Sequence, residues 1–203
     1  MRNLFLSTML VVATSQAALA AGGGAAVGAD APAFTLKDLG GKSIALADYK
    51  DKTVVLEWFN PECPYVRASH TKGSLVDTAK QMTSKGVVWL AVNSAAPGRQ
   101  GAGVDKNREA QKAFGLEHPI LLDENGEVGK AYGATNTPHM YVIAKGKLVY
   151  RGAIDNSPDG EKGEPQGGTL VNYVTAALDD VAAGRPVRTA ETKAYGCGVK
   201  YAK

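Results

Sequence analysis

Cysteine and net charge are both scarce in this chain of 203 residues. Lys and Arg total 23 and Asp and Glu total 20, which leaves a net charge of only +3. So small and evenly spread a charge does not indicate a phosphate-binding surface, and nucleic acid is not an expected partner. The two cysteines, Cys63 and Cys197, exclude the disulfide scaffold of small secreted domains, but they are enough for one bridge or one redox pair.

Long hydrophobic runs and several common site motifs are also missing. The apolar run at residues 4–13 is far shorter than the ~20 residues that cross a bilayer. It follows a short positive start and precedes small residues at 18–20, a pattern typical of a cleaved signal peptide rather than of the alternative, an uncleaved membrane anchor. The sequence contains no phosphate-binding glycine loop, nucleotide fingerprint or Ser-His-Asp signature.

These features give a first assignment of location and domains. We expect a signal peptide at residues 1–20 with cleavage near Ala20, and a single domain at residues 21–203 with a cysteine-containing tail. The mature chain is expected in the periplasm or secreted, without stable membrane insertion, where disulfides persist. A hydrophobic share of 44% is enough for a sizeable core.

The apolar pattern predicts an α/β fold with a mixed central sheet flanked by helices. Residues 53–59 and 87–92 are compact apolar runs, typical of strands buried on both faces. A helix between them, running to Lys85 with a soft spot at Gly73, would complete a βαβ unit with parallel strands. The other expected elements are an N-terminal hairpin (33–36 and 43–46), a helix (105–114), a short strand (120–122), a turn (123–126), a second hairpin (140–143 and 147–151), a surface loop (155–168) and a final helix (170–183). The tail from Arg188 has no clear period.

Cys63 lies where the first buried strand ends and a helix begins. Pro64 favours the first helical position, so we expect Cys63 to be the N-cap, facing unpaired N–H groups and the positive end of the helix dipole. That setting favours a nucleophilic thiolate. Arg67 would add to this effect if it turned back toward the sulfur, whereas Glu62 opposes it. The alternative is a small, inert, buried residue at a strand end.

Three segments together carry a family resemblance. They are Val54-Val55-Leu56-Glu57-Trp58-Phe59 leading into Glu62-Cys63-Pro64-Tyr65-Val66, then Gly133-Ala134-Thr135-Asn136-Thr137-Pro138, and the tail Lys193-Ala194-Tyr195-Gly196-Cys197. Over about residues 31–201 the chain resembles the thioredoxin-like superfamily, in its peroxiredoxin-like, secreted redoxin branch.

The resemblance implies a thioredoxin-like fold and a thiol-dependent oxidoreductase of the antioxidant type. It implies that Thr137 and Pro138 form the cis-proline site that faces the catalytic cysteine. The implied substrates are protein thiols or disulfides, or a peroxide, with an unknown electron donor and no cofactor. The chain departs from the family in two ways. When Cys63 is aligned with the first cysteine of thioredoxins, Val66 stands in place of the second. When the chain is aligned with typical peroxiredoxins, Cys63 falls on their threonine and Val66 on their peroxidatic cysteine.

Cys197 is the only other thiol that could resolve an intermediate on Cys63. Gly196 and Gly198 flank it and leave room for close approach. Three interpretations remain open: a redox-cycling pair, a static structural disulfide, and two independent thiols. A reduction potential below about −300 mV would indicate the static bridge.

A different class of function is a non-catalytic redoxin-fold protein that binds a metal or a protein partner. His70, two turns along the Cys63 helix, and His139, after Pro138, could approach the sulfur and form a copper or zinc site. Surface or structural histidines are the alternative, and we predict no metal ligands.

Overall fold

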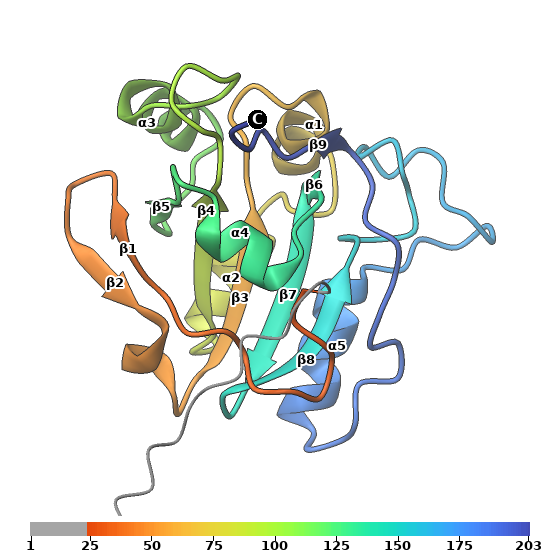
Figure 1. Cartoon of the computed structure of the whole chain (residues 1–203). Helices are drawn as coiled ribbons and strands as arrows, with labels where there is room; N and C mark the ends of the chain where they lie inside the picture. The colour runs from red at the N-terminus through yellow and green to blue at the C-terminus, as the bar shows by residue number, and fades with distance from the viewer. Residues whose placement is uncertain (1–23) are drawn as a thin grey trace, which may run out of the picture.

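The computed structural model describes residues 24–203, so the expected signal peptide lies outside the described residues. A seven-stranded sheet with the order β2-β1-β5-β4-β3-β7-β8 forms the centre (Figure 1). The strands are β1 (Thr35–Asp38), β2 (Ser43–Ala45), β3 (Thr53–Trp58), β4 (Val88–Asn93), β5 (Ile120–Leu122), β6 (Asn136–Thr137), β7 (His139–Ala144), β8 (Lys147–Gly152) and β9 (Cys197–Gly198). The helices are a 3-10 turn (Leu46–Tyr49), α1 (Pro64–Thr71), α2 (Thr78–Ser84), α3 (Val104–Ala113), α4 (Glu127–Tyr132) and α5 (Tyr173–Ala182).

The sheet is mixed, as the sequence predicts. β3 runs parallel to β4, and β4 runs parallel to β5, which confirms the βαβ unit. β7 pairs antiparallel with β3 and with β8, and the β1–β2 hairpin adds antiparallel to β5. Helices cover the sheet, so the α/β class with an N-terminal hairpin and a C-terminal tail is confirmed (Figure 1).

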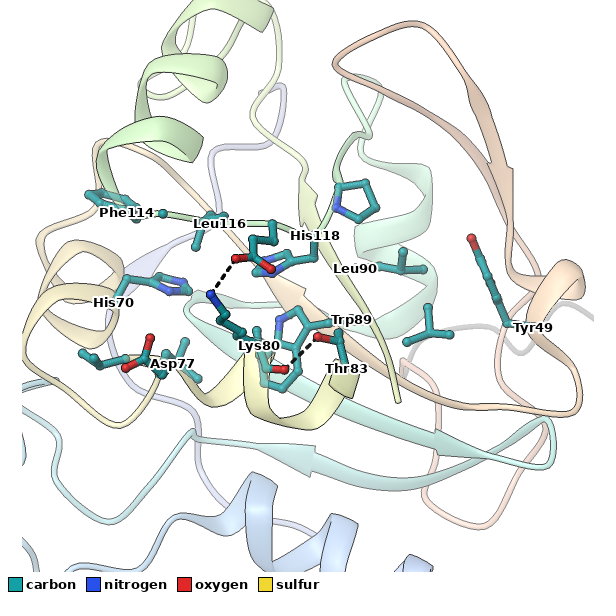
Figure 2. A pocket seen from close by; sticks show the side chains of 17 residues that line it. Tyr49, His70, Asp77, Lys80, Thr83, Trp89, Leu90, Phe114, Leu116 and His118 are labelled. Atoms are coloured by element: carbon teal, nitrogen blue, oxygen red, sulfur yellow. Dashed lines mark hydrogen bonds and ion pairs between the residues drawn. The ribbon is translucent and has the colours of Figure 1, made fainter. Parts of the chain in front are cut away.

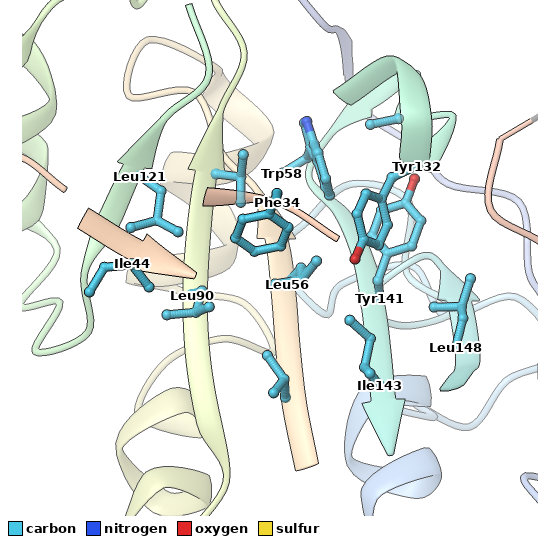
Figure 3. Packing of buried hydrophobic residues seen from close by; sticks show 13 residues of the cluster. Phe34, Ile44, Leu56, Trp58, Leu90, Leu121, Tyr132, Tyr141, Ile143 and Leu148 are labelled. Atoms are coloured by element: carbon cyan, nitrogen blue, oxygen red, sulfur yellow. The ribbon is translucent and has the colours of Figure 1, made fainter. Parts of the chain in front are cut away.

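Both faces of β3 are buried, and successive side chains enter different clusters. Leu56 and Trp58 join the aromatic cluster drawn in Figure 3, where the Trp58 ring lies 5.4 Å from that of Tyr132 and 5.1 Å from that of Tyr141. Val55 packs on the opposite face with residues of α2 and α5. Because both faces are covered, the strand reads as a continuous apolar run rather than an alternating one.

The segment after Cys63 forms two helices: the predicted soft spot at Gly73 is confirmed as a complete break, and the expectation of one continuous helix to Lys85 is wrong. α1 ends at Thr71 and α2 begins at Thr78, with Asp77 in the left-handed region at φ 58°. A Cβ on Gly73 would lie 2.0 Å from the carbonyl oxygen of Gly160. The 155–168 loop therefore packs on this break, and this close approach depends on glycine.

Two other boundaries differ from the sequence prediction. The turn at residues 123–126 continues into α4, which was not expected. The last helix begins at Tyr173 rather than at Leu170, because the Asn172 side chain caps it by accepting a hydrogen bond from the Thr175 N–H at 3.0 Å. Within residues 24–203, no helix is long and apolar enough to span a membrane.

The C-terminal tail, whose sequence has no helical or strand periodicity, contains β9. This two-residue strand pairs antiparallel with β6, beside the start of α1 (Figure 1). A strand of two residues leaves too short a pattern for periodicity to detect. The pairing brings the C-terminal tail to the end of β3, where Cys63 lies.

Candidate functional site

Cys63 is the N-cap of α1, and Pro64 occupies the first helical turn, as the sequence predicts. The residue is only 1% exposed and packs with Phe59, at the end of β3, and with Val66 of α1. Its Sγ donates a hydrogen bond to the main-chain carbonyl of Thr137, with a distance of 3.0 Å from sulfur to oxygen. The strand, the helix start and β6 thus meet at this sulfur.

Thr137 and Pro138 lie directly opposite Cys63. The peptide bond between them is cis, which confirms the expectation from the family resemblance. Thr137 is 2% exposed and ends β6, and β7 begins at His139 immediately after the proline. The structure therefore brings together Cys63, Thr137 and Pro138, as the family resemblance implied.

Cys197 is the fourth predicted site residue and joins the same group. In the β6–β9 pair it lies opposite Thr137, the residue whose carbonyl accepts from Cys63. It is partly buried and packs against the cluster that contains Cys63, and both cysteines are free thiols. Burial, followed by the hydrogen bond and charge of Cys63, raises the pKa of Cys197 to about 11. The Cys197 thiol is therefore protonated at pH 7.

Gly196 permits the tail to approach this closely. Its φ is +102°, and a Cβ there would lie 2.3 Å from the carbonyl oxygen of Thr137. Gly198 differs, because its added Cβ would meet only the Thr135 oxygen at 4.0 Å. Of the two glycines that flank Cys197, only Gly196 is required by the local geometry.

The two charged neighbours of Cys63 have other partners. The guanidinium carbon of Arg67 lies 5.8 Å from the centre of the Phe114 ring, so this cation is directed to an aromatic face. Glu62 is bound by Lys106 at 3.0 Å and by the Gly101 N–H. Those contacts hold the pKa of Glu62 below its ordinary value, with the Lys106 hydrogen bond as the largest cause.

The histidines considered as metal ligands are engaged elsewhere. His70 Nε2 lies 2.7 Å from Glu57 Oε1, and His139 Nδ1 lies 3.2 Å from the Tyr141 hydroxyl. In the described part of the chain, no group of three or more His, Cys, Asp or Glu side chains could hold a metal ion. The hypothesis of a Cys63 metal cluster with these histidines therefore finds no ligand set there.

A buried polar cluster around Glu57 was not anticipated from the sequence. Glu57, fully buried in β3, accepts from His70 and, at 3.1 Å, from the Trp89 indole N–H. Burial raises the pKa of Glu57, but the charge and hydrogen bond of His70, together with smaller contributions from His118 and Trp89, bring the net pKa below the ordinary value. A single carboxylate inside an apolar strand was the available signal.

This cluster lies beside a cavity of about 510 Å³. Figure 2 shows His70, Trp89 and His118 along its lining. Lys80, another lining residue, forms an ion pair with Glu117 at 2.9 Å. His118 is 6% exposed, and its Nε2 has no hydrogen-bond partner among the described residues. Burial lowers the pKa of His118 to about 4, so its ring is neutral at pH 7.

Replacing Glu57 by leucine is expected to lower the free energy of unfolding by about 3–5 kcal/mol, because His70 and the Trp89 N–H lose their acceptor in the interior. Glu57→Gln should cost only about 1 kcal/mol, since the amide oxygen can accept from Trp89 while its NH₂ donates to a neutral His70. Urea unfolding at pH 7 measures both. Glu117→Gln, in an ion pair that is 66% exposed on each side, is the control and should cost less than about 1 kcal/mol. Equal losses in the two Glu57 variants would contradict this assignment.

Comparison with known proteins agrees with this architecture. The Redoxin family model matches residues 26–165, more than half of the chain. Thiol-disulfide oxidoreductase ResA of Geobacillus thermodenitrificans is 36% identical over 125 residues, which cover 61% of this chain and 67% of that protein. A hypothetical protein of Sinorhizobium meliloti has a crystal structure with a TM-score of 0.74 and 28% identity, covering 87% of this chain and 95% of that one.

A third comparison identifies the fold by name. The thioredoxin domain of a thiol-disulfide oxidoreductase from Bacteroides vulgatus has a TM-score of 0.52 and 25% identity, and it covers 62% of this chain and 87% of that domain. The sheet order, the helix that starts at Cys63 and the cis Thr137–Pro138 bond are features of this chain's own structure. Its fold is thioredoxin-like, and the chain belongs to the redoxin family.

Proposed function

We propose that this protein is an extracytoplasmic thiol-disulfide oxidoreductase in which Cys63 is the nucleophile and Cys197 the resolving thiol. The observation that carries the proposal is the β6–β9 pairing, which sets Cys197 opposite Thr137 while the Cys63 sulfur lies 3.0 Å from the Thr137 carbonyl oxygen. The similarity to thiol-disulfide oxidoreductase ResA supports the reaction class. The extracytoplasmic location rests on the signal-peptide pattern of residues 1–20.

The first step is attack on a partner disulfide. Cys63 as thiolate displaces one sulfur of the partner's S–S bond, which leaves as a thiolate, and a mixed disulfide forms between Cys63 and the partner. Cys63 takes this role because Cys197 has a pKa of about 11 and is almost entirely protonated at pH 7. Thr137 and Pro138, which lie opposite the sulfur, shape the surface that the partner meets.

The second step releases the partner. Cys197 loses its proton and attacks the Cys63 sulfur, the mixed disulfide breaks, and the partner leaves with its second thiolate. The products are a Cys63–Cys197 disulfide and a reduced partner, so two electrons pass from the protein to its substrate. An external dithiol must then reduce the pair, and run in reverse the same steps oxidise a partner dithiol. A peroxide is the other substrate class that the family resemblance implied.

Cys197→Ser is expected to trap the first intermediate. The variant should react once with a disulfide substrate such as oxidised glutathione and remain as a stable Cys63 mixed disulfide, because no second thiol can resolve it. Mass spectrometry should find one glutathione per chain on the variant, and an internal disulfide without glutathione on the parent. If the parent also keeps glutathione, Cys197 is not the resolving thiol.

The equilibrium of the pair in glutathione buffers separates a working pair from a static bridge. A working pair should be half reduced at a potential above about −300 mV, in the range of known oxidoreductases, whereas a structural disulfide would lie below it. Alkylation of Cys63 after mild reduction reports the same equilibrium. A parent protein that stays oxidised in excess reduced glutathione would favour the static bridge.

A further inference from the structure

We propose that Tyr195 and Asp155 form a latch that holds the Cys197 segment against Cys63 and thereby governs access to Cys63. The Tyr195 hydroxyl donates to Asp155 Oδ1 at 2.9 Å. Tyr195 lies two residues before Cys197 and Asp155 lies beyond the end of β8, so the contact joins the tail to the body of the protein. The inference rests on the proposed function, because it concerns the same thiol.

The acceptor of the latch is a buried carboxylate with few other partners. Asp155 is 2% exposed, and its Oδ1 also accepts from the Ser157 N–H at 2.9 Å. Its Oδ2 is buried and has no partner among the described residues. Because a buried carboxylate with few donors is poorly solvated, each remaining hydrogen bond stabilises it strongly. The hydrogen bond from the Tyr195 hydroxyl is charge-assisted and therefore stronger than one between neutral groups.

The donor is held in position as well. The Tyr195 ring lies 6.4 Å from the ring of Tyr65, which is the second residue after Cys63. Burial, and then the charge and hydrogen bond of Asp155, raise the pKa of Tyr195 above its ordinary range, so the hydroxyl keeps the proton that it donates. The latch thus contacts α1 on one side and the 155–168 loop on the other.

Cys63 and a partner disulfide can meet only when this segment moves. Cys63 is 1% exposed, and the Cys197 segment, paired with β6, packs against its cluster. The tail beyond Cys197 is fixed separately, since Val199 N–H donates to the Thr135 oxygen at 3.1 Å and the Tyr201 hydroxyl to the Ala134 oxygen at 2.8 Å. Opening at the Tyr195 end would uncover Cys63, and closing would return Cys197 to resolve the mixed disulfide.

The test measures alkylation of Cys63 by iodoacetamide in a Cys197→Ser background, where it is the only thiol of the chain. Adding Tyr195→Phe keeps the ring but removes the donor, and should raise the rate about tenfold at pH 7 by increasing the open population. Asp155→Asn should give a smaller rise, because its amide oxygen still accepts. Tyr132→Phe, which removes a 2.8 Å hydroxyl contact to the Pro32 oxygen and leaves the Tyr195–Asp155 contact intact, is the matched control and should leave the rate unchanged.

Two results would overturn the latch. One is a Tyr195→Phe rate equal to that of the background. The other is an equal rise in Tyr132→Phe, which would assign the opening to global unfolding rather than to the tail. Neither result depends on whether Cys63 and Cys197 form a disulfide, because the test lacks Cys197. Absence of that disulfide in the parent protein would instead count against the proposed function.

Discussion

Cys63→Ser is expected to abolish turnover, with a fall in kcat/KM of at least about 10³-fold for reduction of a protein disulfide by dithiothreitol. Serine can form neither the mixed disulfide nor the internal one, so no alternative route passes through this chain. A loss of this size corresponds to about 4 kcal/mol of transition-state stabilisation. Insulin disulfide reduction, followed by turbidity, measures it.

Folding controls separate chemistry from structure in this experiment. Serine is similar in size to cysteine, and its hydroxyl can still donate to the Thr137 carbonyl that now accepts from sulfur. The free energy of unfolding should therefore change by less than about 1 kcal/mol. Cys197→Ser is the matched variant, which should keep the first step and turn over more slowly than the parent, because only dithiothreitol can then resolve the mixed disulfide. Undiminished turnover in Cys63→Ser would remove Cys63 from the mechanism.

Acid is expected to destabilise the protein between pH 6.5 and pH 4 because two histidines are buried as neutral rings. Burial lowers the pKa of both His118 and His139 from 6.5 to about 4. Between these pH values the histidines are protonated in the unfolded state but not in the folded state. The free energy of unfolding is therefore highest above pH 6.5 and decreases as the pH falls. Each histidine contributes about 3 kcal/mol over the whole window, and the two together about 2.7 kcal/mol per pH unit within it.

Urea unfolding at pH 7.0, 6.0 and 5.0 measures this slope. The range stops at pH 5 because the lowered pKa of Glu57 makes a further contribution only at more acid pH, near and below its ordinary value of 4.5. His118→Gln and His139→Gln should each reduce the slope by about half, since glutamine does not titrate. A slope that survives in the double variant would show that other groups control the acid response.

The sequence alone was enough to place Cys63 between a buried strand and the start of a helix. Residues 53–59 predict a strand covered on both faces, and Pro64 after Cys63 predicts a helix start with the cysteine as its cap. Both are local signals, carried by neighbouring residues, and both are confirmed. The family resemblance added the cis Thr137–Pro138 bond, which spacing could not have supplied.

Other features depended on contacts between distant segments. The sequence indicated a soft spot at Gly73, but not that the carbonyl of Gly160, 87 positions later in the chain, lies where a side chain would be. In the sequence, Glu57 is a single polar residue in an apolar strand. The structure shows that His70 and Trp89 each donate a hydrogen bond to one of its two carboxylate oxygens. No local pattern contains these partners, because each belongs to a different element.

The two cysteines show this division most clearly. The sequence by itself determined that there are only two, that Cys63 caps a helix, and that no third thiol competes with Cys197. Only the tertiary structure decided that the tail pairs with β6 and sets Cys197 opposite Thr137. The physical reason is that a two-residue strand has no stability or periodicity of its own, and takes its place from the hydrogen bonds, glycine contact and buried carboxylate that the rest of the fold provides.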